Sequence, residues 1–207
     1  MAVVNPKVDG GKPFDWGKAS ADYAKYRDIY PEMFYRQILD AGLCVQGQTV
    51  LDLGTGTGVL PRNLYRYGAQ FVGIDLSPEQ IEQARRLAKQ AGMQIDFFAC
   101  PAESVDFPDH TFDVVTACQC FFYFDAKKLL PNLRRMLRPG GRLAILYMAW
   151  LPGEDPIARA SEQLVLRYNP SWSGGGETRH PIELPPETEM YFTVEQEYLF
   201  DLKIPFT

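Results

Sequence analysis

Residues that commonly ligate metals or form disulfides are scarce, with only two histidines and four cysteines in 207 residues. A structural zinc site needs four such ligands at short spacings, and the cysteines and histidines do not supply that pattern. We therefore expect no metal. Four cysteines also fall short of a disulfide framework for a chain of this length, which predicts reduced thiols.

Long apolar runs and an excess of positive charge are missing as well. No stretch approaches the ~20 apolar residues of a membrane span, and residues 1–15 lack the pattern of a signal peptide. We therefore expect a cytoplasmic protein with no membrane span. The formal net charge of -5 repels a phosphate backbone, so no nucleic acid partner is expected. The oligomeric state is left open by these patterns.

The balance of 46% hydrophobic and 23% charged residues is typical of one packed domain over residues 1–207. Apolar runs bounded by turn residues alternate with segments of helical period. This alternation predicts an α/β fold, a Rossmann-like, doubly wound and mostly parallel sheet flanked by helices. We predict five core strands, at Thr49–Leu53, Gln70–Ile74, Ile95–Ala99, Phe112–Ala117 and Arg142–Ala149.

The segments around this core, residues 44–150, have their own patterns. Residues 1–43 have helical spacing interrupted at Pro31 and predict a helical cover. Residues 151–190 combine a helix near 157–167, a glycine-rich stretch and a proline-rich loop, which predict a substrate lid. Residues 191–207 alternate apolar and other side chains from Tyr198 to Phe206, which predicts a sixth, half-buried strand.

Helix signals lie between the predicted strands. A helix from Val59 is expected to stop at Gly68, and Ser77 with Pro78 forms a capping start for the next helix. A further helix runs to Leu137. Pro131 predicts a short first turn ahead of its main segment, because proline disrupts a helix interior.

The strongest functional signal is the loop Gly54-Thr55-Gly56-Thr57-Gly58, which follows an apolar strand and precedes a helix. Alternating glycines permit a tight turn and a close approach of backbone amides to a ligand. Asp75 ends the second strand about 20 residues later, where a carboxylate can accept hydrogen bonds from ribose hydroxyls. Loop and acid together indicate an adenosine-containing ligand.

The spacing argues against a dinucleotide. A G-x-G-x-x-G fingerprint aims a helix at a pyrophosphate, whereas this sequence has Val59 where the last glycine is expected. Asp52, two residues before Gly54, adds negative charge near the ligand. That charge disfavours pyrophosphate and suits a ligand carrying an ammonium and a sulfonium.

In these features the sequence resembles the class I S-adenosylmethionine-dependent methyltransferases, particularly the small-molecule branch that includes enzymes of quinone biosynthesis. The resemblance covers roughly residues 14–149. Its ordered landmarks are Tyr23-Ala24-Lys25-Tyr26-Arg27, Leu51-Asp52-Leu53 with the glycine loop, Gly73-Ile74-Asp75-Leu76-Ser77, Pro101-Ala102-Glu103, Phe112-Asp113-Val114-Val115 and Leu137-Arg138-Pro139-Gly140-Gly141-Arg142-Leu143.

The resemblance implies S-adenosylmethionine as cofactor and gives each landmark a role in binding it. The methionine moiety is held by Asp52, the loop residues Gly54, Thr55, Gly56 and Gly58, and Gln119, while Tyr23 and Arg27 reach its carboxylate. The adenosine moiety is held by Asp75 at the ribose, and by Leu76, Ala102 and Glu103 around adenine. The family also has a seventh, antiparallel strand after the sixth, so we expect the natural protein to continue past Thr207.

The predicted reaction is methyl transfer to a small-molecule acceptor by in-line displacement, in which alignment and exclusion of water supply much of the rate. A base is needed only for an acceptor that is protonated at working pH. Tyr123, within the aromatic run 121–124, and His180, within the lid, are the candidate catalytic residues.

Two other functions fit parts of the sequence. One is a noncatalytic S-adenosylmethionine-binding or scaffold domain, because binding residues alone do not imply turnover. The other is an NAD(P)-dependent reductase, prompted by the spacing of Tyr123 and Lys127, which matches the Tyr/Lys pair of short-chain dehydrogenases. The glycine pattern disagrees with the reductase.

Overall fold

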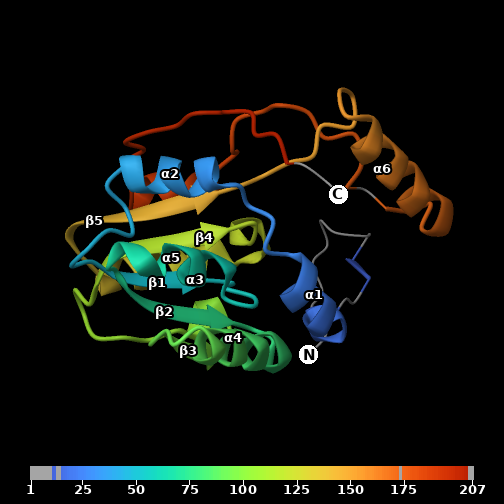
Figure 1. Cartoon of the computed structure of the whole chain (residues 1–207). Coiled ribbons are helices and arrows are strands. Elements are labelled where there is room, and N and C mark those ends of the chain that lie inside the picture. The colour runs from blue at the N-terminus through green and yellow to red at the C-terminus, as the bar shows by residue number, and fades with distance from the viewer. Residues whose placement is uncertain (1–10, 13–14, 173, 205–207) are drawn as a thin grey trace.

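A computed structural model describes residues 11–12, 15–172 and 174–204. Five parallel strands form one sheet in the order β3-β2-β1-β4-β5, with β1 at its centre (Figure 1). The strands are β1 Thr49–Leu53, β2 Gln70–Asp75, β3 Asp96–Ala99, β4 Phe112–Cys118 and β5 Leu137–Leu146. The parallel α/β sheet predicted from the sequence is confirmed.

Helices flank the sheet. The α-helices are α1 Ser20–Tyr26, α2 Glu32–Asp40, α3 Val59–Leu64, α4 Pro78–Gln90, α5 Ala126–Met136 and α6 Pro156–Tyr168. Short 3-10 helices are η2 Trp16–Ala19, η3 Tyr65–Tyr67, η4 Ala102–Ser104, η5 Phe121–Tyr123 and η6 Pro186–Met190. Figure 1 shows α6 standing away from the sheet, and none of the helices described is long and apolar enough to span a membrane.

Each face of the sheet packs on its own helices because side chains alternate along a strand. Val50, Phe71 and Val114 lie in one cluster with buried residues of α2 and α3. Leu51 and Val115, each one residue further along, lie in another cluster with buried residues of α5. These near-continuous apolar strands are buried on both faces, as parallel sheets require.

Local signals place α4 where the sequence predicts it. The Ser77 hydroxyl accepts a hydrogen bond from the amide of Gln80 at 3.3 Å, and Pro78 occupies the first helical position. Beyond the helix, Gly92 has φ +67°, a conformation that only glycine adopts at little cost. Capping at one end and glycine at the other thus fix the length of α4.

The proline in α5 does not divide the helix. Pro131 lies inside a continuous α-helix, so the short separate turn predicted from it is wrong. Proline removes one backbone donor from the helix, but Leu129, Leu133 and Met136 are fully buried against the sheet. Their burial outweighs the lost hydrogen bond.

The fifth strand begins earlier than predicted. Leu137 already pairs with Phe112, and the register then shifts so that Arg142 pairs with Val114. The intervening residues 138–141 bulge out of the ladder, with Gly140 at φ +77°. The strand ends at Leu146, so Tyr147–Ala149 of the prediction lie beyond it.

The predicted sixth strand is wrong for its described residues, because no strand lies within residues 147–172 or 174–204. A strand needs a hydrogen-bonded neighbour, and alternation alone does not provide one. Both sides of the segment remain exposed, at 51% for Tyr198, 58% for Leu199 and 41% for Phe200. The end of this prediction, residues 205–207, lies outside the described residues, as do residues 1–10 and 13–14 of the helical cover and residue 173 of the lid.

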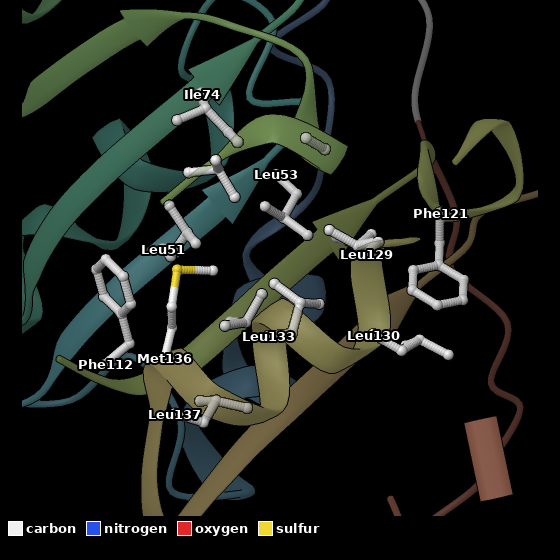
Figure 2. Packing of buried hydrophobic residues seen from close by; sticks show 14 residues of the cluster. Leu51, Leu53, Ile74, Phe112, Phe121, Leu129, Leu130, Leu133, Met136 and Leu137 are labelled. Atoms are coloured by element: carbon white, nitrogen blue, oxygen red, sulfur yellow. The ribbon is translucent and has the colours of Figure 1, made fainter. Parts of the chain in front are cut away.

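The main core lies between α5 and the sheet. Figure 2 shows Leu129, Leu133 and Met136 of α5 pointing toward Leu51 and Leu53 of β1. All of these side chains are essentially inaccessible to solvent. The central strand is therefore held from one side by a single helix.

Replacing Leu133 by alanine should lower the free energy of unfolding by about 2–5 kcal/mol, because it empties a fully buried site. Leu164→Ala on α6 is the matched control. Leu164 is 56% exposed, and its loss should cost less than about 0.5 kcal/mol. Urea unfolding of both variants checks this, and equal losses would show that α5 does not carry the core.

Candidate functional site

The site lies at the carboxyl edge of the sheet. β1 pairs with β2 on one side and β4 on the other, and in such open parallel sheets ligands bind beyond the strand ends at this switch in strand order. In Figure 1 the arrowheads of the strands point toward the side where α1 lies. Most of the residues predicted for the site lie at or just beyond these strand ends.

A buried carboxylate lies beneath the glycine loop. Asp52 is 2% exposed and lies directly between Gly73 of β2 and Thr116 of β4 in the strand register. Its carboxylate accepts hydrogen bonds of 2.6 Å from the hydroxyls of Thr55 and Thr116. Gly73 leaves room for the hydrogen bond between Asp52 and Thr55, because a Cβ at Gly73 would lie 2.8 Å from the Thr55 hydroxyl oxygen.

Burial changes the acidity of Asp52. Loss of solvent raises its pKa from 3.8 to about 6, although the two threonine hydroxyls oppose the change. The sequence predicts a direct contact between Asp52 and the methionine moiety. The structure places this carboxylate under the loop, where it accepts from the Thr55 hydroxyl, and its contact with the methionine moiety stays a prediction.

Asp75 joins the loop to the second strand. Its carboxylate accepts the backbone amides of Gly56 and Ser77, each at 2.8 Å, and the amide of Thr55 donates to the carbonyl of Ile74 at 2.8 Å. Burial raises the pKa of Asp75 above its ordinary value, while the two amides act in the opposite direction. Because each carboxylate oxygen has two lone pairs, capacity remains for further donors.

The three glycines of the loop differ in what surrounds them, although all have positive φ. A Cβ at Gly54 would lie 2.8 Å from Cys120, and a Cβ at Gly58 would lie 2.8 Å from Phe97. A Cβ at Gly56 would meet no atom within 4 Å. The loop is therefore packed at both ends and open at its centre, where its backbone can approach a ligand.

The N-terminal helix brings Tyr23 and Arg27 to this edge. The Arg27 guanidinium lies 5.3 Å from the centre of the Tyr23 ring. The positive charge of Arg27 interacts electrostatically with Tyr30 and with Cys118 at the end of β4. The Cys118 thiol donates a hydrogen bond of 3.5 Å to the Tyr30 hydroxyl oxygen. Burial raises the pKa of the Cys118 thiol to about 12. Arg27 thus provides a cation near the end of β4.

The remaining predicted cofactor residues differ in exposure. Leu76 is half-buried after Asp75, while Ala102 is buried in the main core. The Glu103 carboxylate accepts the amide of Asp125 at 2.9 Å. Gln119 has φ +65° and donates its side-chain amide to the carbonyl of Met148 at 2.7 Å.

The two candidate catalytic residues lie on the β4 and β5 side. Tyr123 is the last residue of η5. Burial is the largest cause that raises its pKa, and the electrostatic effect of Tyr23 is the second largest. His180 faces oxygen acceptors with both ring nitrogens, the carbonyl of Pro181 at 2.8 Å and the Glu177 carboxylate at 2.6 Å. These two contacts raise its pKa, which favours a doubly protonated ring that donates.

Sequence reasoning missed Thr116, Tyr147 and Glu177. Thr116 is a buried polar residue between the apolar residues Val115 and Ala117, and that contrast was a usable signal. Tyr147 donates its hydroxyl to Glu177 at 3.0 Å across 30 residues of sequence. No local sequence pattern predicts a contact between residues so far apart in the chain.

The reductase interpretation does not fit the structure. Tyr123 lies in η5 and Lys127 in the first turn of α5, with Asp125 at the helix start between them. The Lys127 ammonium lies 3.5 Å from Glu187. The two side chains therefore do not share one helix face as a Tyr/Lys pair requires.

Hollows elsewhere on the molecule do not coincide with the carboxyl edge. One of about 520 Å³ lies between the end of α2 and residues 195–198, and one of about 460 Å³ lies beside the bulge at residues 138–141. Among the described residues no three histidine, cysteine or acidic side chains gather in a way that could hold a metal ion.

A parallel sheet with a glycine loop after its first strand and an aspartate at the end of its second strand is typical of nucleoside-binding α/β domains. Residues 51–145 match the family model described as the methyltransferase domain. Residues 51–145 are therefore similar to a methyltransferase domain, a family that implies S-adenosylmethionine as methyl donor.

Curated relatives carry related names. A "Demethylmenaquinone methyltransferase" of Thermus thermophilus is 40% identical over 114 residues, which cover 54% of this chain and 52% of the relative. A "Ubiquinone biosynthesis O-methyltransferase" of Cereibacter sphaeroides is 32% identical over 133 residues, 64% of this chain and 54% of the relative. The chain spans about half the length of these relatives.

A solved structure supports the fold. A SAM-dependent methyltransferase from Aquifex aeolicus aligns with a TM-score of 0.57 at 20% identity, covering 83% of this chain and 93% of that one. At this identity the likeness concerns the fold alone.

Gly56→Ala should weaken binding of S-adenosylhomocysteine at least tenfold, because a methyl group would fill the open centre of the loop. Gly92→Ala is the matched control, since Gly92 also has positive φ and open space but closes α4. Both variants should lose about 1–2 kcal/mol of stability from backbone strain. Calorimetric affinity separates them, and equal affinities would contradict a ligand at Gly56.

The raised pKa of Asp52 should make the stability of the fold depend on pH in an unusual direction. Its folded pKa of about 6 lies above the ordinary 3.8, so the folded state binds the proton more tightly than the unfolded chain. Its contribution is fully present below pH 4 and is lost as the pH rises to about 6. The free energy of unfolding of the wild type relative to Asp52→Asn should therefore fall on the order of 2 kcal/mol over this range. A difference that is constant with pH in urea unfolding would refute the assignment.

Proposed function

We propose that this chain transfers the methyl group of S-adenosylmethionine to a small-molecule acceptor by in-line displacement. The observation that carries the proposal is the open centre of the glycine loop at Gly56, held in place by Asp75 and, through Thr55, by Asp52. When bound, the cofactor supplies an electrophilic methyl group on a sulfonium.

The residues present fit this cofactor. Asp75 lies at the end of β2 with acceptor capacity for ribose hydroxyls, and Leu76 beside it offers an apolar surface for adenine. Glu103 follows β3 on the same side. Arg27 supplies positive charge for a carboxylate. Gln119 positions the turn after β4 by bonding to the carbonyl of Met148, and we assign it to the methionine side.

The acceptor side is assigned to the ends of β4 and β5. Tyr123 and its neighbours in η5 offer aromatic surface there, and residues 151–190 are proposed as the lid that excludes water. The names of the two quinone-pathway relatives support a quinone-related small molecule as acceptor. The main catalytic contribution of the protein is to hold the acceptor and the methyl group in line.

A noncatalytic S-adenosylmethionine-binding domain is the second candidate, because the same loop and carboxylate would serve it. Transfer of an isotopically labelled methyl group to a metabolite extract distinguishes the two. Label in a small molecule supports the enzyme, and tight cofactor binding without any transfer supports the binding domain.

Asp75→Ala should weaken binding of both S-adenosylmethionine and S-adenosylhomocysteine by about 10- to 100-fold, because it removes a charged acceptor and frees the amide of Gly56. Asp96→Ala is the matched control. Asp96 is an exposed aspartate that begins β3, at the opposite end of the sheet. Isothermal titration calorimetry should find the control unchanged, and unchanged binding by Asp75→Ala would overturn the proposed site.

A further inference from the structure

An aromatic surface follows the ends of β4 and β5. Phe122 and Tyr147 meet edge to face with ring centres 5.8 Å apart and planes at 90°. Tyr123 lies close enough to Tyr147 to affect its acidity. These three side chains are 37–40% exposed, so their rings are accessible. Such a surface suits a flat aromatic molecule, which gains from edge-to-face and stacked contacts.

A hydrogen-bonded chain leads away from this surface. The Tyr147 hydroxyl donates to Oε2 of Glu177 at 3.0 Å, and Nε2 of His180 lies 2.6 Å from Oε1 of the same carboxylate. The other nitrogen of His180 faces the carbonyl of Pro181 at 2.8 Å. Glu177 is thus fixed by a donor on each oxygen, and its side chain is 24% exposed.

The protonation states along this chain follow from its geometry. Burial raises the pKa of Tyr147 to about 12, and the adjacent Glu177 charge adds to the effect, so the phenol stays protonated and donates. Its oxygen keeps lone pairs that can accept a proton from a bound molecule. Glu183 is a further charge that acts on His180, and Tyr123 is the other titratable group that acts on Tyr147.

We propose that Tyr147 and Glu177 form a proton relay for an aromatic acceptor that carries a ring hydroxyl, with His180 as the positioning residue for Glu177. This inference rests on the proposed function. It places the acceptor ring against Phe122 and Tyr147, with its hydroxyl on the Tyr147 oxygen.

The relay accounts for each bond and each proton in the methyl transfer. The acceptor oxygen forms a bond to the methyl carbon as the carbon–sulfur bond breaks, and that electron pair stays on sulfur. The hydroxyl proton of the acceptor passes to the Tyr147 oxygen, while the Tyr147 proton passes to Glu177. The carboxylate ends as the acid, and His180 keeps its own protons.

The test uses the full chain saturated with S-adenosylhomocysteine and 4-nitrocatechol as probe, whose absorption spectrum reports ionisation of its ring hydroxyl without any turnover. The pH titration of the bound probe is compared between wild type, Tyr147→Phe and Glu177→Gln. Phenylalanine keeps the ring contact with Phe122 and removes only the hydroxyl. Tyr168→Phe and Glu189→Gln are the matched controls, because both residues are exposed and lie outside the relay.

The wild type should ionise the bound probe at a pH about one unit above that of the free probe, because the Tyr147 oxygen accepts from the neutral hydroxyl and the Glu177 charge lies nearby, and both relay variants should lose this shift. The two controls should keep it. Equal titrations in wild type and Tyr147→Phe, or no probe binding by protein that binds S-adenosylhomocysteine, would overturn the relay while leaving the proposed function intact. Failure to bind S-adenosylhomocysteine in the first place would overturn both.

Discussion

The carboxylate of Asp52, buried between three strands, is the constraint on which the site depends. It accepts hydrogen bonds from the hydroxyls of Thr116 on β4 and Thr55 in the loop. Gly73 of β2 has no side chain and so leaves room for this arrangement. A buried carboxylate without donors would be costly, so these partners must stay in register. The central strands and the glycine loop are thereby fixed as one unit, and the open backbone at Gly56 is a result of that rigidity.

Much of the fold is readable from local signals. The range of β1 is the predicted one, because a short apolar run between turn residues is a strong strand signal. The helix α4 begins where Ser77 and Pro78 predict. The failed prediction of a sixth strand has a clear cause. Tyr198 and its alternating neighbours have the period of a strand but no partner strand, and pairing is a property of the assembled sheet.

The site was only partly readable for the same reason. The glycine loop and Asp75 are close in sequence, and the structure joins them directly. The role of Asp52 at the methionine moiety rests on its charge and on the family resemblance, and it stays a prediction. Its side chain lies under the loop beside Thr116. Tyr147 and Glu177 meet only because the chain returns to the end of β5 after α6, which no spacing rule describes.

The position of Cys120 has a consequence for chemical durability. Its sulfur lies against Gly54, and burial holds the thiol pKa well above its ordinary value. A thiolate is a strong nucleophile and a thiol a weak one. Under the proposed function, the sulfur beside the cofactor loop is thus kept in the form least able to be alkylated by S-adenosylmethionine.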